Sequence, residues 1–368
     1  MRRAILWAGA GVAILLMGGS CPPTRGAGGD KAAAVIEPDV FRLYEQVGFR
    51  IRIRPGRELK SGAMIECQLP NSFTNDQVSP SKVKRWQTTD PAQPHHIAVS
   101  ASPPATATFA SKVIPREWVG GPKCPTRHGR CLVATLTSGA IPGDGEVVVE
   151  YRNTTSPWLA NQKPGATANE GLVWVRVDGR EVEKLPSFRV LPGPASYRRL
   201  IVPSSARPGE KFRALLVSLD KYNNLSASAY ENVAVTLGEK VLAGGISYTG
   251  RAEVEVSIDA EGVHRLTADG IVSNPIRITG SPGGPLWGDI HFHDFISMDA
   301  MGNTPYEYAR DVSGLDFAAT AEHSAIGLDE HWRQTQEWCR AHYAPGRFVT
   351  LLGFEVNLGW HHNAYLWQ

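Results

Sequence analysis

Residues 281–294 read SPGGPLWGDIHFHD, and the pattern of the chain changes within this stretch. Before it, apolar residues alternate with polar ones, which is typical of β-strands with one buried face. The glycines and prolines of SPGGP break that pattern. After it, strands of small and apolar residues alternate with amphipathic helices. The sequence therefore predicts all-β domains followed by a parallel α/β unit.

The composition is that of a globular protein with more than one domain. A chain of 368 residues is long enough for two or three domains. Apolar residues make up 42% of it and charged residues 20%, and the net charge is +2. This near-neutral balance gives no indication of a nucleic-acid partner or of a polybasic membrane-binding segment.

Segment 1–21 is typical of an export signal. A basic start is followed by an apolar run, 4–17, that is short for a membrane-spanning helix. The tetrapeptide GGSC at 18–21 resembles a bacterial lipoprotein cleavage site with Cys21 as the lipid-bearing residue, although such sites usually carry leucine where Gly18 stands. We expect an exported periplasmic or cell-surface lipoprotein, attached to the membrane through its lipid only. Plain secretion and a retained N-terminal anchor are the alternatives.

The other four cysteines divide into a close pair and two single residues. Cys124 and Cys131 bracket the polar segment CPTRHGRC. An oxidising compartment favours a disulfide between them, and two free thiols are the alternative. Cys67 alternates with apolar residues and Cys339 lies in a helical pattern, so we expect both side chains to be buried.

Two β-domains are predicted ahead of the SPGGP linker. Residues 22–37 are expected to be a flexible tether of low complexity. Residues 38–195 contain period-two strands such as FRIRIRP and predict a β-sandwich with an irregular insertion around 71–130. Residues 196–280 repeat short strands and turns at the spacing of an immunoglobulin-like domain.

Residues 286–368 predict a β-α-β-α-β unit. TPYE at 304–307 is a capping box with proline at the first helical position, and its helix is expected to end at Gly314. LDFAATAEH (315–323) and RFVTLLGFEV (347–356) are expected to be strands buried on both faces, with an amphipathic helix between them. The chain then ends inside an expected fourth strand.

Imidazoles and carboxylates follow the predicted strand ends, where parallel α/β folds place their functional sites. His291 and His293 are spaced by two, so both point to the same face. Such a pair alone is more often incidental on a sheet surface, but further candidate ligands at the next strand ends favour a multinuclear metal site. These further candidates are Asp299, Glu322, His323, Glu355, His361 and His362.

Taken together, these motifs resemble the PHP (polymerase and histidinol phosphatase) superfamily. The resemblance covers residues 286–368 and rests on GDIHFH, AATAEH, TLLGFE and HHNAY. It is nearest to exported or lipid-anchored bacterial proteins with β-sandwich domains before the metal domain. It implies a distorted (β/α)7 barrel that binds two or three divalent metals (Zn, Mn or Fe). This chain would hold only its first three β/α units, and we expect such a fragment to be inactive.

The resemblance implies a role for each candidate ligand. His291 and His293 would hold one metal. Asp299 and His323 would hold a second. Glu355 would bridge two metals. The loop around Asp299 lacks the small Ser-Asp-Gly run of the family, so this position departs from the family pattern.

The remaining assignments concern a third metal position and the residues behind the ligands. His361 is preferred over His362 as the third-position ligand, because the family histidine lies two residues before the asparagine. Asp289 would orient a histidine by accepting its other N–H. Glu322 stands where the family has aspartate, and it and His362 would support the ligands from behind.

The expected function is that of an exported metal-dependent hydrolase, a phosphoesterase acting on a small or polymeric phosphate ester. Hydrolysis would use metal-activated water, so no side chain is assigned as a catalytic nucleophile. One alternative is an amidohydrolase-type enzyme, which shares the H-x-H motif on its first barrel strand. Another is a surface adhesion or carbohydrate-binding protein whose α/β tail is degenerate.

Overall fold

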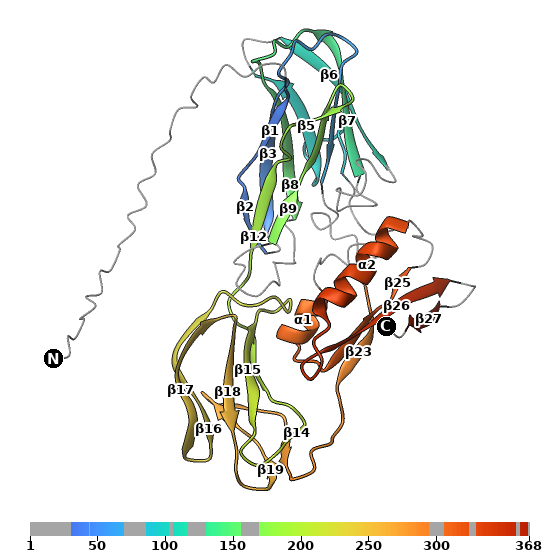
Figure 1. Cartoon of the computed structure of the whole chain (residues 1–368). Helices are drawn as coiled ribbons and strands as arrows, with labels where there is room; N and C mark the ends of the chain where they lie inside the picture. The colour runs from blue at the N-terminus through green and yellow to red at the C-terminus, as the bar shows by residue number, and fades with distance from the viewer. Residues whose placement is uncertain are drawn as a thin grey trace, which may run out of the picture.

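The computed structural model arranges the chain in three bodies of secondary structure (Figure 1). Strands make up 57% of the residues that the structure describes, and helices 7%. The described residues are 31–43, 45–69, 86–102, 106–115, 130–155, 169–293, 305–323, 329–357 and 361–366. The predicted export signal and Cys21 lie outside these ranges and stay predictions. Within the ranges, none of the helices is both long enough and apolar enough to cross a membrane.

The first body is a β-sandwich, as the alternating N-terminal pattern predicts. Its strands are β1 (Ala33–Glu37), β2 (Val40–Arg42), β3 (Gln46–Arg54), β4 (Met64–Gln68), β5 (His96–Ala101), β6 (Ala107–Pro115), β7 (Arg130–Gly139), β8 (Val147–Thr155), β9 (Asn169–Leu172), β10 (Trp174–Val177), β11 (Arg180–Glu181) and β12 (Ser187–Leu191). The sheets β1-β3-β8-β5 and β11-β10-β4-β7-β6 share one apolar core, to which Ile51 and Ile65 contribute from opposite sheets. A third sheet has the order β2-β12-β9.

Two expectations for this region need correction. Residues 33–37, which the sequence places in the tether, form β1, and this strand pairs with β3 and buries Ile36 in the core. The supposed irregular insertion around 71–130 contains β5 and β6, one in each main sheet. The strands in these segments are short or half-exposed. Alanines and polar residues therefore obscure the alternation of apolar and polar positions that would predict a strand.

The second body is a smaller β-sandwich. Its strands are β13 (Tyr197–Ile201), β14 (Ser205–Ala206), β15 (Lys211–Leu219), β16 (Ala229–Leu237), β17 (Lys240–Thr249), β18 (Arg251–Ser257), β19 (Gly262–His264), β20 (Thr267–Ala268), β21 (Ile271–Val272) and β22 (Ile276–Ile278). The sheet β13-β15-β18-β17-β16-β20-β21 packs on the sheet β14-β22-β19. Phe212 and Leu216 on β15, with Ile276 on β22, belong to the core between them.

The third body is the predicted β-α-β-α-β unit. Its elements are β23 (Gly288–Phe292), α1 (Pro305–Asp311), β24 (Phe317–Thr320), β25 (Glu322–His323), α2 (Asp329–His342), β26 (Val349–Asn357) and β27 (His361–Leu366). β24 runs parallel to both β23 and β26, which confirms the parallel arrangement. The helix α1 begins at Pro305, and Gly314 follows its end with a φ of 66°, as the sequence predicts.

A (β/α) barrel is not supported by the described residues. The sheet has the order β23-β24-β26-β25, and β27 pairs with β26 in the antiparallel direction. Only residues 358–360 separate β26 from β27. That connection is too short for the crossover that a parallel strand requires, so the last strand returns as a hairpin. The expected fourth strand is present as β27, but its antiparallel direction does not continue a (β/α) barrel.

The α/β unit packs against the second sandwich, where α1 lies beside β15 (Figure 1). Val312, just after α1, is buried against Leu215 and Val217 of β15. The hydroxyl of Tyr308 donates a hydrogen bond of 3.0 Å to the carbonyl oxygen of Asn223. These contacts hold the sheet that carries the candidate site to the preceding domain.

Candidate metal centre

The H-x-H pair lies at the carboxyl end of β23. The first residue of the strand, Gly288, lies under the ring of Phe317, and a Cβ there would be 2.3 Å from that ring. The neighbouring parallel strand therefore requires glycine at this position. Asp289 accepts a hydrogen bond of 2.9 Å from the backbone N–H of His291, so it shapes the strand that carries the pair. His291 and His293 bring their Nε2 atoms to 3.2 Å from each other.

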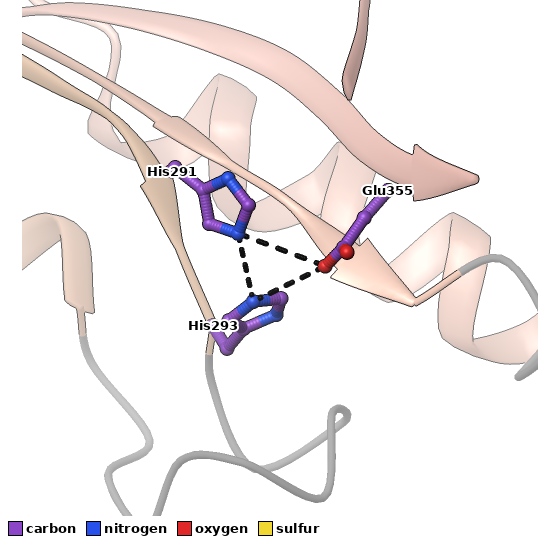
Figure 2. Close-up of side chains that lie close together, drawn as sticks. All are labelled: His291, His293 and Glu355. Atoms are coloured by element: carbon purple, nitrogen blue, oxygen red, sulfur yellow. Dashed lines mark hydrogen bonds and ion pairs between the residues drawn. The ribbon is translucent and has the colours of Figure 1, made fainter. Parts of the chain in front are cut away.

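Glu355 is the buried centre of the cluster. It lies near the end of β26, with 0% of its surface exposed, opposite His323 of β25 in the parallel register. Its Oε2 atom is 3.6 Å from His291 Nε2 and 3.5 Å from His293 Nε2 (Figure 2). The same oxygen is 3.3 Å from His323 Nδ1. Three imidazoles therefore face one carboxylate oxygen.

The second oxygen of Glu355 faces a different histidine. His361 Nδ1 pairs with Oε1. His361 lies at the start of β27, directly opposite Asn357 in the hairpin register, and most of its side chain is exposed. The two oxygens of Glu355 thus point toward two groups of imidazoles, an arrangement suited to a carboxylate that bridges two cations.

The donor set fits a divalent transition metal. His291, His293 and Glu355 offer three ligand atoms that all lie within 4.8 Å of one another. Neither oxygen of Glu355 accepts a hydrogen bond of normal geometry from a described residue. A buried carboxylate without hydrogen bonds is unfavourable, and a cation held together with neutral imidazoles would compensate it. Imidazole and carboxylate ligands suit zinc, manganese and iron.

The structure brings together some of the expected site residues and separates others. His291, His293, His323, Glu355 and His361 converge on one point, and the rings of His293 and His323 stack with centroids 4.8 Å apart. Asp299 lies outside the described residues and its role stays a prediction, as does the disulfide, since Cys124 also lies outside them.

The residues expected to support the ligands lie less directly on the site. Glu322 is buried, and because it precedes His323 on β25 its side chain points to the other face of the sheet. His362 is exposed on β27, on the face opposite His361. Asp289 accepts a hydrogen bond from a backbone amide, that of His291, rather than from an imidazole. Cys67 and Cys339 are buried as expected.

Two residues of β27 that the sequence analysis did not select also contact the site. Asn363 Nδ2 lies 2.8 Å from His291 Nδ1. The hydroxyl of Tyr365 donates a hydrogen bond of 2.6 Å to the carbonyl oxygen of Ile290. Desolvation raises the pKa of Tyr365, while a hydrogen bond with Asn363 opposes that shift. Both residues alternate with His361 along the strand, and this alternation was the available signal.

Comparisons with known proteins do not identify a family. No protein-family model matches the chain, and no curated protein matches it. A solved structure of the Yersinia pseudotuberculosis adhesin InvE is similar over 67% of this chain, with 12% identity and a TM-score of 0.21, and the match spans 58% of the adhesin. This chain thus covers less than two thirds of that protein.

Two further solved structures are comparably distant. The Pseudomonas fluorescens alkylpurine DNA glycosylase AlkC matches 45% of this chain and 31% of its own, with 10% identity and a TM-score of 0.19. AvmM, which catalyses macrocyclization in alchivemycin A biosynthesis, matches 45% of this chain and 92% of its own, with 13% identity and a TM-score of 0.18. Scores this low carry no argument about fold or function.

Proposed function

We propose that this chain belongs to an exported, lipid-anchored hydrolase that depends on divalent metal ions and cleaves phosphate esters. The observation that carries the proposal is the buried carboxylate of Glu355, which three imidazole nitrogens approach at 3.3 to 3.6 Å on one oxygen while a fourth faces the other. The resemblance of residues 286–368 to the PHP superfamily, with its metal count, is part of the proposal.

Each residue of the cluster has a defined task in this proposal. His291, His293 and His323 would hold metal ions as neutral ligands, and Glu355 would bridge them and offset their charge. His361, at the exposed rim, would complete a position that faces solvent and therefore substrate. When bound, the metals would activate water and polarise the phosphoryl oxygens. No side-chain nucleophile is needed, which agrees with the absence of a G-x-S-x-G motif from the sequence.

A hydrolase assay with matched substrates tests the reaction class. The full-length protein, purified and loaded with zinc or manganese, is expected to hydrolyse p-nitrophenyl phosphate or bis-p-nitrophenyl phosphate, and Glu355→Gln is expected to abolish this activity. Phosphate-ester hydrolysis that persists in Glu355→Gln would contradict the proposed site. Cleavage of p-nitroanilide or dihydropyrimidine substrates in place of phosphate esters would assign the site to an amidohydrolase-type reaction.

A further inference from the structure

Two side chains of β27 reach across the sheet to β23, although among the described strands β27 pairs with β26. Asn363 lies 2.8 Å from Nδ1 of His291, and Tyr365 binds the carbonyl oxygen of Ile290. The ring of Tyr365 passes over Gly353 of β26, where a Cβ would be 2.7 Å from the ring. Glycine at this position thus allows side chains of β27 to reach β23.

The hydrogen bond between Asn363 and His291 links the orientation of the amide to the tautomer of the ring. With Nδ2 of the amide facing the ring, the amide donates and Nδ1 accepts. A neutral imidazole then carries its proton on Nε2. That nitrogen faces His293 Nε2 at 3.2 Å and Glu355 Oε2 at 3.6 Å. A protonated nitrogen can donate a hydrogen bond to His293 Nε2 but cannot bind a metal ion.

The opposite orientation of the same amide has the opposite effect. If the Asn363 side chain turns by half a rotation, Oδ1 accepts a hydrogen bond from Nδ1–H. The lone pair of Nε2 is then free to face His293 and Glu355. Metal-binding histidines usually donate their other N–H to such an acceptor, which fixes the tautomer and the ring orientation.

We infer that Asn363 is a positioning residue for the metal centre, which selects the tautomer of His291 and reverses its amide when metal binds. This inference rests on the proposed metal-dependent function. An amide serves both tautomers because it offers a donor and an acceptor. A carboxylate at this position would support only the metal-binding tautomer, and an aliphatic side chain would support neither. Tyr365 keeps the strand in place through its bond to Ile290.

Three variants separate this role from a purely structural one. In Asn363→Asp the metal-free protein is expected to hold His291 with its proton on Nδ1, and zinc affinity is expected to equal or exceed that of the wild type. In Asn363→Leu zinc affinity is expected to fall by about 10- to 100-fold. Leu366→Asn is the control, because it places an amide on the exposed opposite face of the same strand. We expect it to leave zinc affinity unchanged.

The readouts are zinc affinity, by competition with a chromophoric chelator, and the His291 tautomer, by ¹⁵N-edited NMR with and without zinc. In the wild type the proton is expected on Nε2 without zinc and on Nδ1 with zinc. Wild-type zinc affinity in Asn363→Leu, or equal losses in Asn363→Asp and Asn363→Leu, would overturn the inference and leave the metal centre intact. A wild-type protein that takes up no zinc would overturn the proposed function. If the proton of His291 stays on the same nitrogen in Asn363→Asp as in the wild type, the inference is overturned whether or not zinc binds.

Discussion

At the scale of single residues, the candidate centre depends on a buried charge that the protein does not satisfy by itself. Glu355 is fully buried, and no described residue gives either oxygen a hydrogen bond of normal geometry. Groups of this kind usually have an internal partner or a bound ion. We therefore expect the fold to be most stable when a cation is bound, since a cation that binds the folded state and not the unfolded one adds to the free energy of unfolding.

Replacing Glu355 should separate metal binding from stability. Glu355→Gln keeps the side-chain shape and removes the charge, so we expect the metal-free variant to be at least as stable as the wild type. The wild type should gain about 2.7 kcal/mol at zinc concentrations 100 times the Kd, and the variant should gain nothing. Thermal unfolding with EDTA and with zinc measures both quantities. An equal gain in the variant would contradict a ligand role for Glu355.

Much of this centre is predictable from sequence, and the reason for the remainder is physical. His291, His293, His323, Glu355 and His361 follow three consecutive strands, and parallel strand ends meet at one edge. Asn363 was not selected, because its contact with His291 depends on the direction of the last strand. That direction follows from the short connection at 358–360 rather than from a residue pattern.

At the scale of elements, two glycines determine how closely the strands of the α/β sheet approach. Gly288 lies under Phe317, and Gly353 lies between the Thr320 carbonyl oxygen and the ring of Tyr365. Periodicity predicts that these segments are strands, but it does not show that their glycines lie in close contact with neighbouring strands. Those contacts form between strands that are distant in sequence, so pattern analysis does not detect them.

Adding a methyl group at Gly353 should displace β27. In Gly353→Ala the new Cβ would be 2.5 Å from the Thr320 carbonyl oxygen and 2.7 Å from the Tyr365 ring. We expect a loss of about 1–3 kcal/mol in unfolding free energy, because neither neighbour is free to move without breaking strand contacts. Urea denaturation measures the loss.

Gly283→Ala in the linker is the control for this change. No atom lies within 4 Å of the Cβ it would add, and we expect its effect to stay within about 0.5 kcal/mol. Comparable losses in the two variants would show that the contact around Gly353 is not the cause.

At the scale of the whole molecule, the second sandwich and the α/β unit share an ion network around the buried carboxylate of Asp311. Asp311, at the end of α1, binds Arg310 through two hydrogen bonds of 2.9 and 2.6 Å. Arg251 of β18 and Arg347 of the α/β unit lie 3.9 and 3.7 Å from it. Burial raises the pKa of Asp311, but the hydrogen bonds and charges of Arg310, Arg251 and Arg347 outweigh burial and lower it below its ordinary value.

This network should make the junction sensitive to acid. Because the folded-state pKa of Asp311 is lowered, its stabilisation is fully present above the unfolded-state pKa of about 3.9 and is lost as the pH falls through the folded-state value. Asp311→Asn should therefore cost on the order of 1–3 kcal/mol at pH 7 and progressively less below about pH 4. Urea denaturation across this range measures the difference. A cost independent of pH would contradict the network.

The central claim is that His291, His293 and Glu355 hold a divalent metal ion. The most direct test is the metal content of the purified protein by inductively coupled plasma mass spectrometry, compared with the His291→Ala, His293→Ala double variant. We expect at least one equivalent of zinc, manganese or iron in the wild type, and its loss in a variant whose circular dichroism is unchanged. Equal metal content in the two proteins, or no metal in the wild type after dialysis against a trace-metal buffer, would contradict it.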